Sequence, residues 1–138
     1  MYEENNIFAK ILRGEIPCNK VYEDDETFVF MDIMPRSNGH CLVIPKTPAR
    51  NIFDCDEKAL SAVMRTAKKM AIACTKAFDA DGITIQQFNE NAGGQVVFHL
   101  HLHVIPRFEG VKLRPHSSDI EAANVLAENA KKLIAAQS

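Results

Sequence analysis

The sequence lacks the features that mark membrane-spanning, secreted and nucleic-acid-binding chains. No apolar run in its 138 residues approaches the ~20 residues that a membrane-spanning helix needs. The opening stretch Met1 to Asn6 contains neither the basic nor the apolar region of a signal peptide. A formal net charge of −2 gives no electrostatic attraction for a nucleic acid or a membrane surface. We therefore expect a cytoplasmic protein with no nucleic-acid partner and no membrane partner.

Cysteine is also scarce, and its spacing excludes the common metal motifs. The four cysteines are Cys18, Cys41, Cys55 and Cys74, and no two of them form a Cys-x-x-Cys pair. Widely spaced cysteines of this kind are typical of reduced thiols in a cytosolic protein. Zinc binding through cysteine has little support.

What the chain does contain is the composition of an ordinary globular domain. Hydrophobic residues make up 46% and charged residues 25%, and no internal repeat is present. A chain of this length forms one domain with room for a core. We predict a single domain over residues 1–138, with a core in 1–107 and a C-terminal loop and helix in 108–138.

The hydrophobic periodicity predicts both helices and strands along the chain. A short helix over 7–13, capped by Asn5 or Asn6, carries an apolar face that includes Phe8 and Ile11. A longer helix has an apolar stripe from Leu60 to Phe78, and Ser118-x-x-Glu121 predicts a capping box for a final helix. Strands are expected over 20–23, 27–31, 40–44, 82–89 and 98–104.

The last of these strands carries the chemistry. Between Phe98 and Val104 apolar residues alternate strictly with His99, His101 and His103. Alternation of this kind places the apolar residues in a core and the three histidines in a row on the open face of a sheet. A lone histidine on a strand is more often a satisfied side chain, but three in register indicate a site.

A row of imidazoles could either bind a metal or perform nucleophilic catalysis. Two histidines at i and i+2 can share a zinc ion, whereas three on one straight strand converge on one ion with difficulty because their side chains stand nearly parallel. In nucleophilic catalysis the central imidazole attacks while its neighbours orient it or hold the charge of the substrate. The row suits the second use better.

The run His99-Leu100-His101-Leu102-His103-Val104-Ile105 resembles the His-φ-His-φ-His-φ-φ signature of the histidine-triad (HIT) family, where φ is an apolar residue. The segments Asp32-Ile33 and His40 to Lys46 also resemble this family, as does Asn89 followed by Gly93-Gly94-Gln95. The stretch Ile7 to Pro17 is similar to the opening of the Hint branch. The resemblance extends to Arg107.

The resemblance implies an α+β fold, with an antiparallel sheet of about five strands, flanking helices and a sheet continued across a homodimer. It also implies a nucleotide hydrolase or transferase that acts at the α-phosphate of purine nucleoside monophosphate conjugates. These are phosphoramidates, acyl-adenylates or dinucleoside polyphosphates, and the product is AMP or GMP. The nucleophile would be His101, which forms a nucleotidyl-histidine, and no cofactor or metal is required.

Roles for other residues follow from the same resemblance. His99 and His103 would assist His101, and His40 would support the triad. Oxygen atoms of the substrate would be held by His103, Gln95, Asn89 and the N–H groups near Gly94, Val96 and Val97. The nucleoside would lie among Phe8, Ile11, Phe30, Ile33 and Asp32, with the Asp32 carboxylate on the ribose hydroxyls. His116 is expected to be exposed and unrelated to the triad.

The chain departs from the family pattern in two places. Val96 stands where many members carry Ser or Thr, so a hydroxyl that can reach the phosphate or the leaving group is missing. Some bacterial relatives bind structural zinc through two cysteines and two histidines. The first three of those positions correspond here to Asn6, Ala9 and Pro48, and only His99 is left. We expect that zinc site to be absent.

Two other classes of function remain open at this stage. One is a metal-dependent hydrolase that uses the histidine row, which metal analysis and chelator resistance would distinguish. The other is a nucleotide-binding scaffold with vestigial activity, which turnover assays would distinguish.

Overall fold

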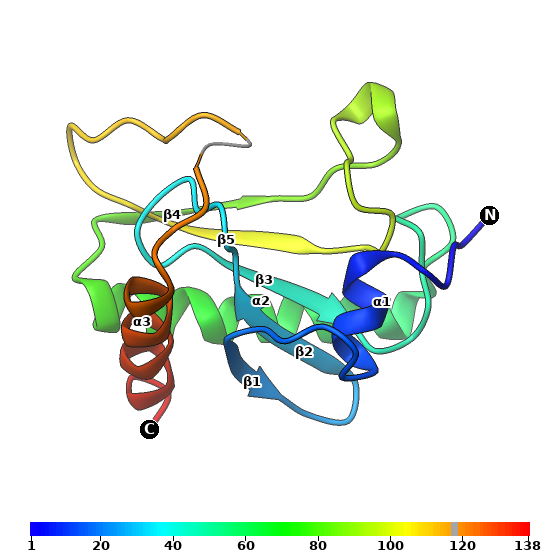
Figure 1. Cartoon of the computed structure of the whole chain (residues 1–138), viewed down its shortest axis with the longest axis horizontal. Helices are drawn as coiled ribbons and strands as arrows, with labels where there is room; N and C mark the ends of the chain where they lie inside the picture. Colours follow the sequence, from blue (N-terminus) through cyan, green and yellow to red (C-terminus); the bar gives the residue numbers. More distant parts are fainter. Residues whose placement is uncertain (117–118) are drawn as a thin grey trace.

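Five antiparallel strands form one sheet in the order β1-β2-β3-β5-β4 (Figure 1). The computed structural model describes residues 1–116 and 119–138. The strands are β1 (Lys20–Glu23), β2 (Thr27–Met31), β3 (Cys41–Pro45), β4 (Gly82–Gln86) and β5 (Leu102–Arg107). The helices are α1 (Ile7–Leu12), α2 (Glu57–Phe78), the 3₁₀ turn η1 (Asn91–Gly93) and α3 (Ala123–Ala135). The expected α+β fold is confirmed.

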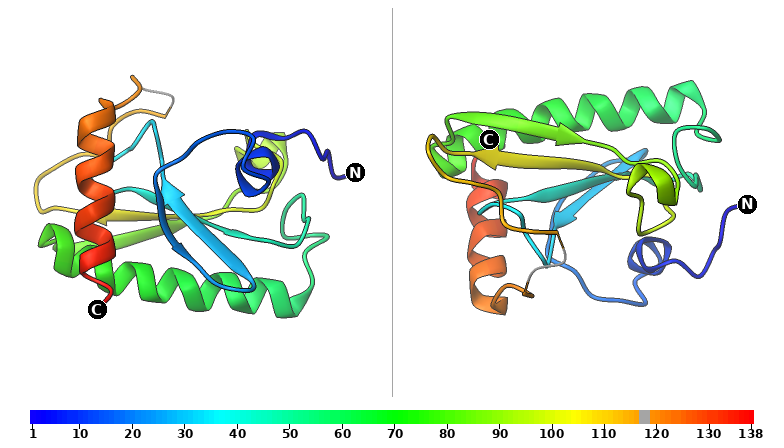
Figure 2. Two further views of the ribbon diagram at one scale, coloured as in Figure 1. Left: turned by 60° about the horizontal axis from the view of Figure 1, so that its bottom comes forward. Right: turned by 90° about the horizontal axis from the view of Figure 1, so that it is seen from above.

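The sheet separates two apolar clusters, one on each face. Figure 2 shows α2 and α1 on opposite sides of the sheet. Val29, Met31, Cys41 and Val43 pack toward α2 and α3, together with Leu102 and Val104 of β5. Phe28, Phe30, Leu42 and Ile44 pack toward Phe8 and Ile11 of α1. Because side chains alternate along a strand, β2 and β3 are buried on both faces, and α1 covers part of the face that carries the histidines.

The strand expected over 98–104 begins later than the alternation suggested. Strand pairing starts at Leu102, and β4 ends at Gln86 rather than at Asn89. Leu100 is buried in the α2 cluster as expected, but Phe98 is half-buried outside it, with the Arg50 guanidinium 4.2 Å above its ring. The histidine row is also not open, since His99 is fully buried and His101 is only 7% exposed. Periodicity indicated the correct face but not the segments that cover it.

Helix caps agree with the sequence at two of the three helices. Asn6 Oδ1 accepts a hydrogen bond from Ala9 N at 2.9 Å, and Asp56 Oδ1 accepts one from Ala59 N at 2.7 Å. The capping box proposed for the last helix is wrong. Ser118 lies outside the described residues, and α3 begins only at Ala123, with no side-chain cap. The Glu121 carboxylate instead pairs with Arg114 at 3.2 Å.

A glycine fixes the turn that delivers His40 to the sheet. Gly39 has φ of +93°, a conformation that side chains other than glycine rarely adopt. A Cβ atom at this position would lie 2.5 Å from the Phe78 ring at the end of α2. The residue before His40 must therefore be glycine, because both its backbone conformation and its surroundings exclude a side chain.

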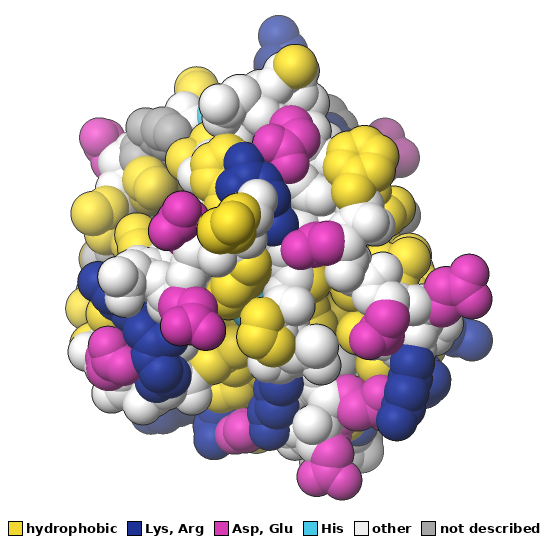
Figure 3. All heavy atoms as spheres, turned by 90° about the vertical axis from the view of Figure 1, so that its right-hand side faces the viewer, with side chains coloured by type: hydrophobic (Ala, Val, Ile, Leu, Met, Phe, Trp, Pro, Cys, Tyr) yellow, Lys and Arg dark blue, Asp and Glu magenta, His cyan; other side chains and the backbone are white. Residues whose placement is uncertain are grey.

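The surface carries charges of both signs. On the face that includes the N-terminus and α1, acidic, basic and hydrophobic side chains are interspersed, and very little histidine is visible (Figure 3). In the described part of the chain, no helix combines the length and the apolar character that crossing a membrane requires.

Candidate active site

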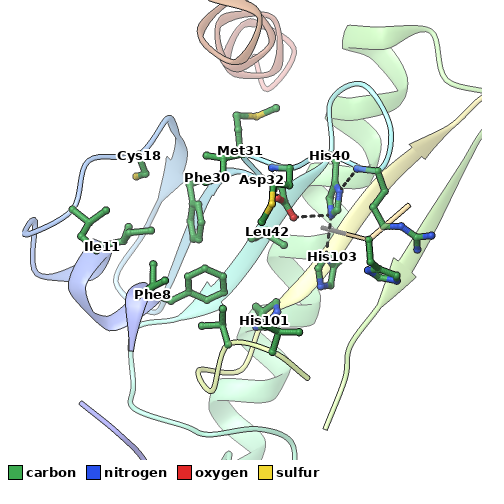
Figure 4. A pocket seen from close by; sticks show the side chains of 18 of the residues that line it. Phe8, Ile11, Cys18, Phe30, Met31, Asp32, His40, Leu42, His101 and His103 are labelled. Carbon is green, nitrogen blue, oxygen red and sulfur yellow. Dashed lines mark hydrogen bonds and ion pairs between the residues drawn. The ribbon is translucent and has the colours of Figure 1, made fainter. Parts of the chain in front are cut away.

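A cavity of about 260 Å³ lies on the histidine face of the sheet, between α1, the loop after β2 and the segment that precedes β5. One end is apolar and is formed by Phe8, Ile11, Ile16, Cys18, Phe30 and Leu42. The other end carries Asp32, Arg36, His40, His103 and His116. Figure 4 shows Ile11 and Cys18 at the first end, His40 and His103 at the second, and His101 along the wall between them. The cavity therefore offers an apolar surface for a flat ring system next to a polar, histidine-rich surface.

The hydrogen bonds of His99 and His101 define which ring nitrogen of each carries a proton. His101 Nδ1 lies 2.7 Å from the backbone oxygen of His99, so Nδ1 donates and the lone pair is on Nε2. His99 Nε2 lies 2.9 Å from the backbone oxygen of Pro45 and must donate, so His99 Nδ1 accepts the bond from the Tyr2 hydroxyl at 2.7 Å. The His101 Nε2 lone pair is thus the nucleophilic atom that this arrangement presents.

The hydrogen bonds of His40 and His103 likewise define which ring nitrogen of each carries the proton. The Arg36 backbone N–H donates to His40 Nδ1 at 3.0 Å, which places the proton of His40 on Nε2. His40 Nε2 lies 2.9 Å from His103 Nδ1 and therefore donates to it. His103 then carries its proton on Nε2, at the other edge of a ring whose centroid is 5.0 Å from that of His101. An N–H donor is consequently held beside the nucleophile.

Burial keeps these histidines neutral. It lowers the pKa of His101 to about 4, the pKa of His40 to about 3 and the pKa of His103 to about 2. For His103, the Arg36 guanidinium and the neighbouring imidazoles of His101 and His40 also oppose a positive charge on the ring, which lowers its pKa further. At pH 7 the imidazole of His101 is therefore unprotonated, which a nucleophile requires.

Asp32 is the one carboxylate among the residues that line the cavity. Its Oδ1 accepts a hydrogen bond from Met34 N at 2.9 Å, and its Oδ2 lies 3.5 Å from His40 Nε2. Burial raises the pKa of Asp32 to about 6, so the group is mostly ionised at pH 7 and has accepting capacity left. Since His40 is neutral, the 3.5 Å approach is not an ion pair. Asp32 is a structurally available acceptor for hydroxyl groups, the role that the family resemblance implies for it.

Three residues at the polar end of the cavity form a cluster that could hold a metal ion. Ligand atoms of Asp32, His40 and His103 lie within 4.8 Å of one another. Binding a cation here would require the His40 Nε2 lone pair and hence a proton on Nδ1, where it would face the Arg36 N–H that already donates to that atom. Two opposed donors in a buried position are unfavourable. The donor set fits a hydrogen-bonded relay better than a metal site, which argues against the metal-dependent hydrolase.

The loop before the triad offers N–H donors at two of the three residues where they were expected. The N–H groups of Gly93, Gly94 and Gln95 donate to backbone oxygens of the η1 turn at 3.0 Å. Those of Val96 and Val97 have no acceptor among the described residues, and both valines line the cavity. Gly94, with φ of +94°, makes the bend that directs this segment toward the cavity. The donors available to an anion are therefore those of Val96 and Val97.

Three predicted site residues do not reach the cavity with their side chains. Gln95 is 3% exposed, and its amide bonds Glu90 N, the Arg50 oxygen and the Val97 oxygen, which fixes the shape of the loop. Asn89 bonds Ile52 N and Gln87. The His99 ring lies between Tyr2 and Pro45, so His99 contributes through its backbone oxygen.

The other predicted residues do line the cavity: Phe8, Ile11, Phe30, Asp32, Ile33, His40, Gly94, Val96, Val97, His101 and His103. Sequence reasoning missed Arg36, Phe88 and His116, which also line it. Arg36 was detectable from its position in the loop between Asp32 and His40. Phe88 and His116 carried no signal in the sequence, because their place depends on how the chain turns after β4 and β5.

We expect the purified protein to contain far less than one zinc per chain. Asn6 Oδ1 caps α1, and both ring nitrogens of His99 already have partners, so the zinc ligands of the bacterial relatives have no counterpart here. Elemental analysis checks the content, and thermal unfolding with and without a chelator is the control. About one zinc per chain, with stability lost on chelation, would overturn this prediction.

Comparisons with known proteins agree with this geometry. The family model described as the HIT domain matches residues 13–110. A crystal structure of a Hit-like protein from Bartonella henselae superposes with a TM-score of 0.92 at 53% identity, covering 99% of each chain. Adenosine 5'-monophosphoramidase hnt1 of Schizosaccharomyces pombe is 37% identical over 101 residues, which is 73% of each protein. Adenylylsulfatase HINT3 of Arabidopsis thaliana is 36% identical over 121 residues, which is 83% of this chain and 61% of the plant protein.

The match of the family model covers most of the chain, and it includes His40, Asp32 and the complete triad. The fold, the face of the sheet that carries the histidines and the ordered imidazole of His101 are consistent with it. The chain belongs to the histidine-triad (HIT) family of nucleotide-binding hydrolases and transferases.

Proposed function

We propose that the protein cleaves nucleoside monophosphate conjugates at the α-phosphate, through a nucleotidyl intermediate on His101. The observation that carries this proposal is the 2.7 Å hydrogen bond from His101 Nδ1–H to the His99 oxygen, which leaves Nε2 as a neutral nucleophile in the cavity wall. The name of the hnt1 relative, adenosine 5'-monophosphoramidase, supports a phosphoramidate as one substrate.

The cavity suggests how such a substrate would be arranged. The purine would lie in the apolar end between Phe8, Ile11 and Phe30, where a flat ring removes apolar surface from water. The ribose hydroxyls would donate to Asp32. The α-phosphate would then accept from His103 Nε2–H and from the free N–H groups of Val96 and Val97. This order places the phosphorus next to His101.

The reaction proceeds in two displacements. His101 Nε2 attacks the α-phosphorus, a P–N bond forms, and the bond to the leaving group breaks with its electron pair on the leaving group. A basic leaving group such as ammonia takes a proton from solvent. Water then attacks the phosphorus, the P–N electron pair returns to Nε2, and the water proton replaces the one that was consumed. The net change is hydrolysis to the nucleoside monophosphate and the protonated leaving group.

A panel of purified conjugates tests the proposal. It should contain adenosine and guanosine phosphoramidates, an acyl-adenylate and a dinucleoside polyphosphate, each assayed for release of the monophosphate. Turnover of at least one class, resistant to chelators, is the expected result. If no member of the panel is turned over although AMP binds, the protein is a scaffold with vestigial activity.

We expect Asp32→Ala to weaken nucleotide binding while the fold is retained. A hydrogen bond from a hydroxyl to a charged acceptor is worth roughly 1.5–3 kcal/mol, so the affinity for AMP should fall about 10-fold to 100-fold. Titration calorimetry measures the affinity, and Asp25→Ala, which removes an exposed carboxylate in the β1–β2 turn, is the matched control. Equal affinity of Asp32→Ala and wild type for AMP would show that Asp32 only shapes the loop.

The raised pKa of Asp32 gives this prediction a second readout. Because that pKa is about 6, the carboxylate becomes protonated as the pH falls from 7 to 5, and it then accepts hydrogen bonds less well. Binding should weaken over this range in wild type but not in Asp32→Ala. Adenosine is the better probe here, since a phosphate group itself titrates near pH ~6.

The homodimer that the family resemblance implies stays a prediction. Among the residues that the structure describes, β4 pairs with β5 alone, so its outer edge presents backbone groups without a strand partner, and Ile85 on this strand is 41% exposed. An edge strand with an exposed apolar residue suits pairing with a second copy of the chain, which would continue the sheet.

A further inference from the structure

The segment after β5 returns to the active site and is held there by three hydrogen bonds, two between backbone groups and one from a side chain. Arg114 N donates to the Arg36 oxygen at 2.8 Å, and Arg36 Nε donates to the Arg114 oxygen at 3.0 Å. Farther along, Glu121 N donates to the Ile33 oxygen at 2.8 Å. The partner segment in all three bonds is the loop between Asp32 and His40. The C-terminal segment is therefore attached to the loop that carries the polar end of the cavity.

This attachment brings His116 to the cavity. His116 lines the cavity, and its ring packs edge-to-face on Phe88 with centroids 6.1 Å apart. Phe88 packs in turn on His103, with centroids 5.5 Å apart. The expectation that His116 is unrelated to the triad is therefore wrong, although the residue is exposed as expected. One aromatic ring separates it from the histidine beside the nucleophile.

This end of the cavity carries one cation, Arg36, and one carboxylate, Asp32, among the described residues. Arg36 lines it, and its two terminal guanidinium nitrogens have no acceptor among the described residues. The single carboxylate of the lining, Asp32, has one oxygen on Met34 N and the other directed toward His40. Glu121 is paired with Arg114 and does not line the cavity. Beyond the His101 and His103 rings, the lining therefore offers the His116 ring and the Arg36 guanidinium, which forms no ion pair with a carboxylate of the described residues.

We propose that Arg36 and His116 form an anion subsite for the leaving group, so that the preferred substrates join the nucleotide to an acidic group such as phosphate, a second nucleotide or sulfate. This inference rests on the proposed function. With the purine in the apolar end, the ribose at Asp32 and the phosphorus at His101, the leaving group extends past His101 toward Arg36 and His116. The guanidinium and the imidazole meet it there, and they stabilise the negative charge that builds on it as the bond to phosphorus breaks.

The test compares leaving groups of different charge on the same nucleotide. Adenosine 5'-phosphosulfate and diadenosine triphosphate release anions, and adenosine 5'-monophosphoramidate releases ammonia. His116→Ala is expected to lower kcat/KM about 10-fold or more for the two anionic conjugates, the effect of one lost charge-assisted hydrogen bond, and to leave the phosphoramidate within about twofold. Arg36→Gln should act in the same direction.

Two matched variants separate binding from packing. His116→Phe keeps a ring against Phe88 but removes the N–H donor, so it should lose the same activity as His116→Ala. Lys112→Ala removes a cation from the same segment, at a residue that lines a separate depression beside Gly82 and Phe108, and should change nothing. A loss in His116→Ala that His116→Phe restores would overturn the proposal, as would equal losses for anionic and neutral leaving groups or no loss at all.

A binding measurement tests the subsite even if the proposed reaction is wrong. In a His101→Ala background, which consumes no nucleotide, the β-phosphate of ADP occupies the position of the leaving group. ADP should bind more tightly than AMP, and adding His116→Ala should remove that difference while leaving AMP affinity unchanged. Equal affinities for ADP and AMP before the second substitution would contradict the subsite. A clear difference without turnover of any conjugate would contradict only the proposed function.

Discussion

Replacement of His101 with alanine is expected to lower kcat by about 10³-fold or more while nucleotide binding is retained. The reason is that neither of the other two triad imidazoles can replace His101 Nε2. The His99 ring has both nitrogens engaged, and His103 presents an N–H at the edge that is not bound to His40. Without the His101 imidazole the covalent route is lost entirely, whereas loss of a binding contact only weakens affinity.

Detection of the intermediate makes this prediction specific. Rapid quench of the wild type with a labelled phosphoramidate, followed by peptide mass spectrometry, should place the nucleotide on His101. His101→Ala should show no adduct but should bind AMP with near-normal affinity by calorimetry. Near-normal turnover in His101→Ala, or a label on any other residue, would show that the mechanism is wrong.

The pH dependence of kcat provides an independent check on the same nucleophile. Burial lowers the pKa of His101 to about 4, so the attacking nitrogen stays unprotonated as the pH falls through the ordinary histidine value of ~6.5. We expect kcat to stay level from pH 8 to about 5 and to decline only below that. A decline centred near pH 6.5 would indicate a solvated imidazole instead of the buried one.

Local patterns in the sequence predicted the β1–β2 hairpin with the correct bounds. The strands expected over 20–23 and 27–31 are found with the same bounds, because an acidic turn separates two apolar runs. The alternation of Phe28 and Phe30 against Val29 and Met31 also assigned the two faces correctly. Such features depend on neighbours in the chain, which a sequence displays directly.

Features that depend on contacts between distant segments were not predictable. The alternation from Phe98 to Val104 could not show that α1 and the segment around His116 cover the histidine face. Gln95 lies next to the triad in the sequence, but its amide is used by Arg50, Glu90 and Val97, so it shapes the loop instead of facing a substrate. Only the folded structure shows which polar side chains already have hydrogen-bond partners within the protein.

Replacement of His103 with alanine is expected to lower kcat/KM by about 10²-fold for every leaving group. His103 Nε2–H is placed beside the nucleophile, where negative charge grows on the phosphate oxygens in the transition state, and loss of one such donor typically costs ~10²–10³-fold in rate. This loss differs from the one expected at His116, which depends on the charge of the leaving group. Steady-state kinetics on an anionic and a neutral conjugate distinguish the two.

His40 should act only through His103. Its Nε2–H donates to His103 Nδ1 at 2.9 Å and thereby keeps the His103 proton on Nε2. His40→Ala should therefore lower kcat/KM by a smaller factor than His103→Ala, and it should have almost no further effect in a His103→Ala background, because coupled residues are not additive. His40→Gln, whose amide N–H can replace the donor at Nε2, should recover part of the activity.

The tautomer of His103 provides the readout that a purely structural role of His40 would not change. Nitrogen NMR of the His103 ring should show the proton on Nε2 in the wild type and in His40→Gln, and a mixture of the two neutral forms in His40→Ala. Since the Arg36 N–H also loses its acceptor in His40→Ala, a lower thermal stability is expected in that variant and does not decide the question. An unchanged tautomer combined with full additivity of His40→Ala and His103→Ala would show that His40 supports the fold and not the orientation of the donor.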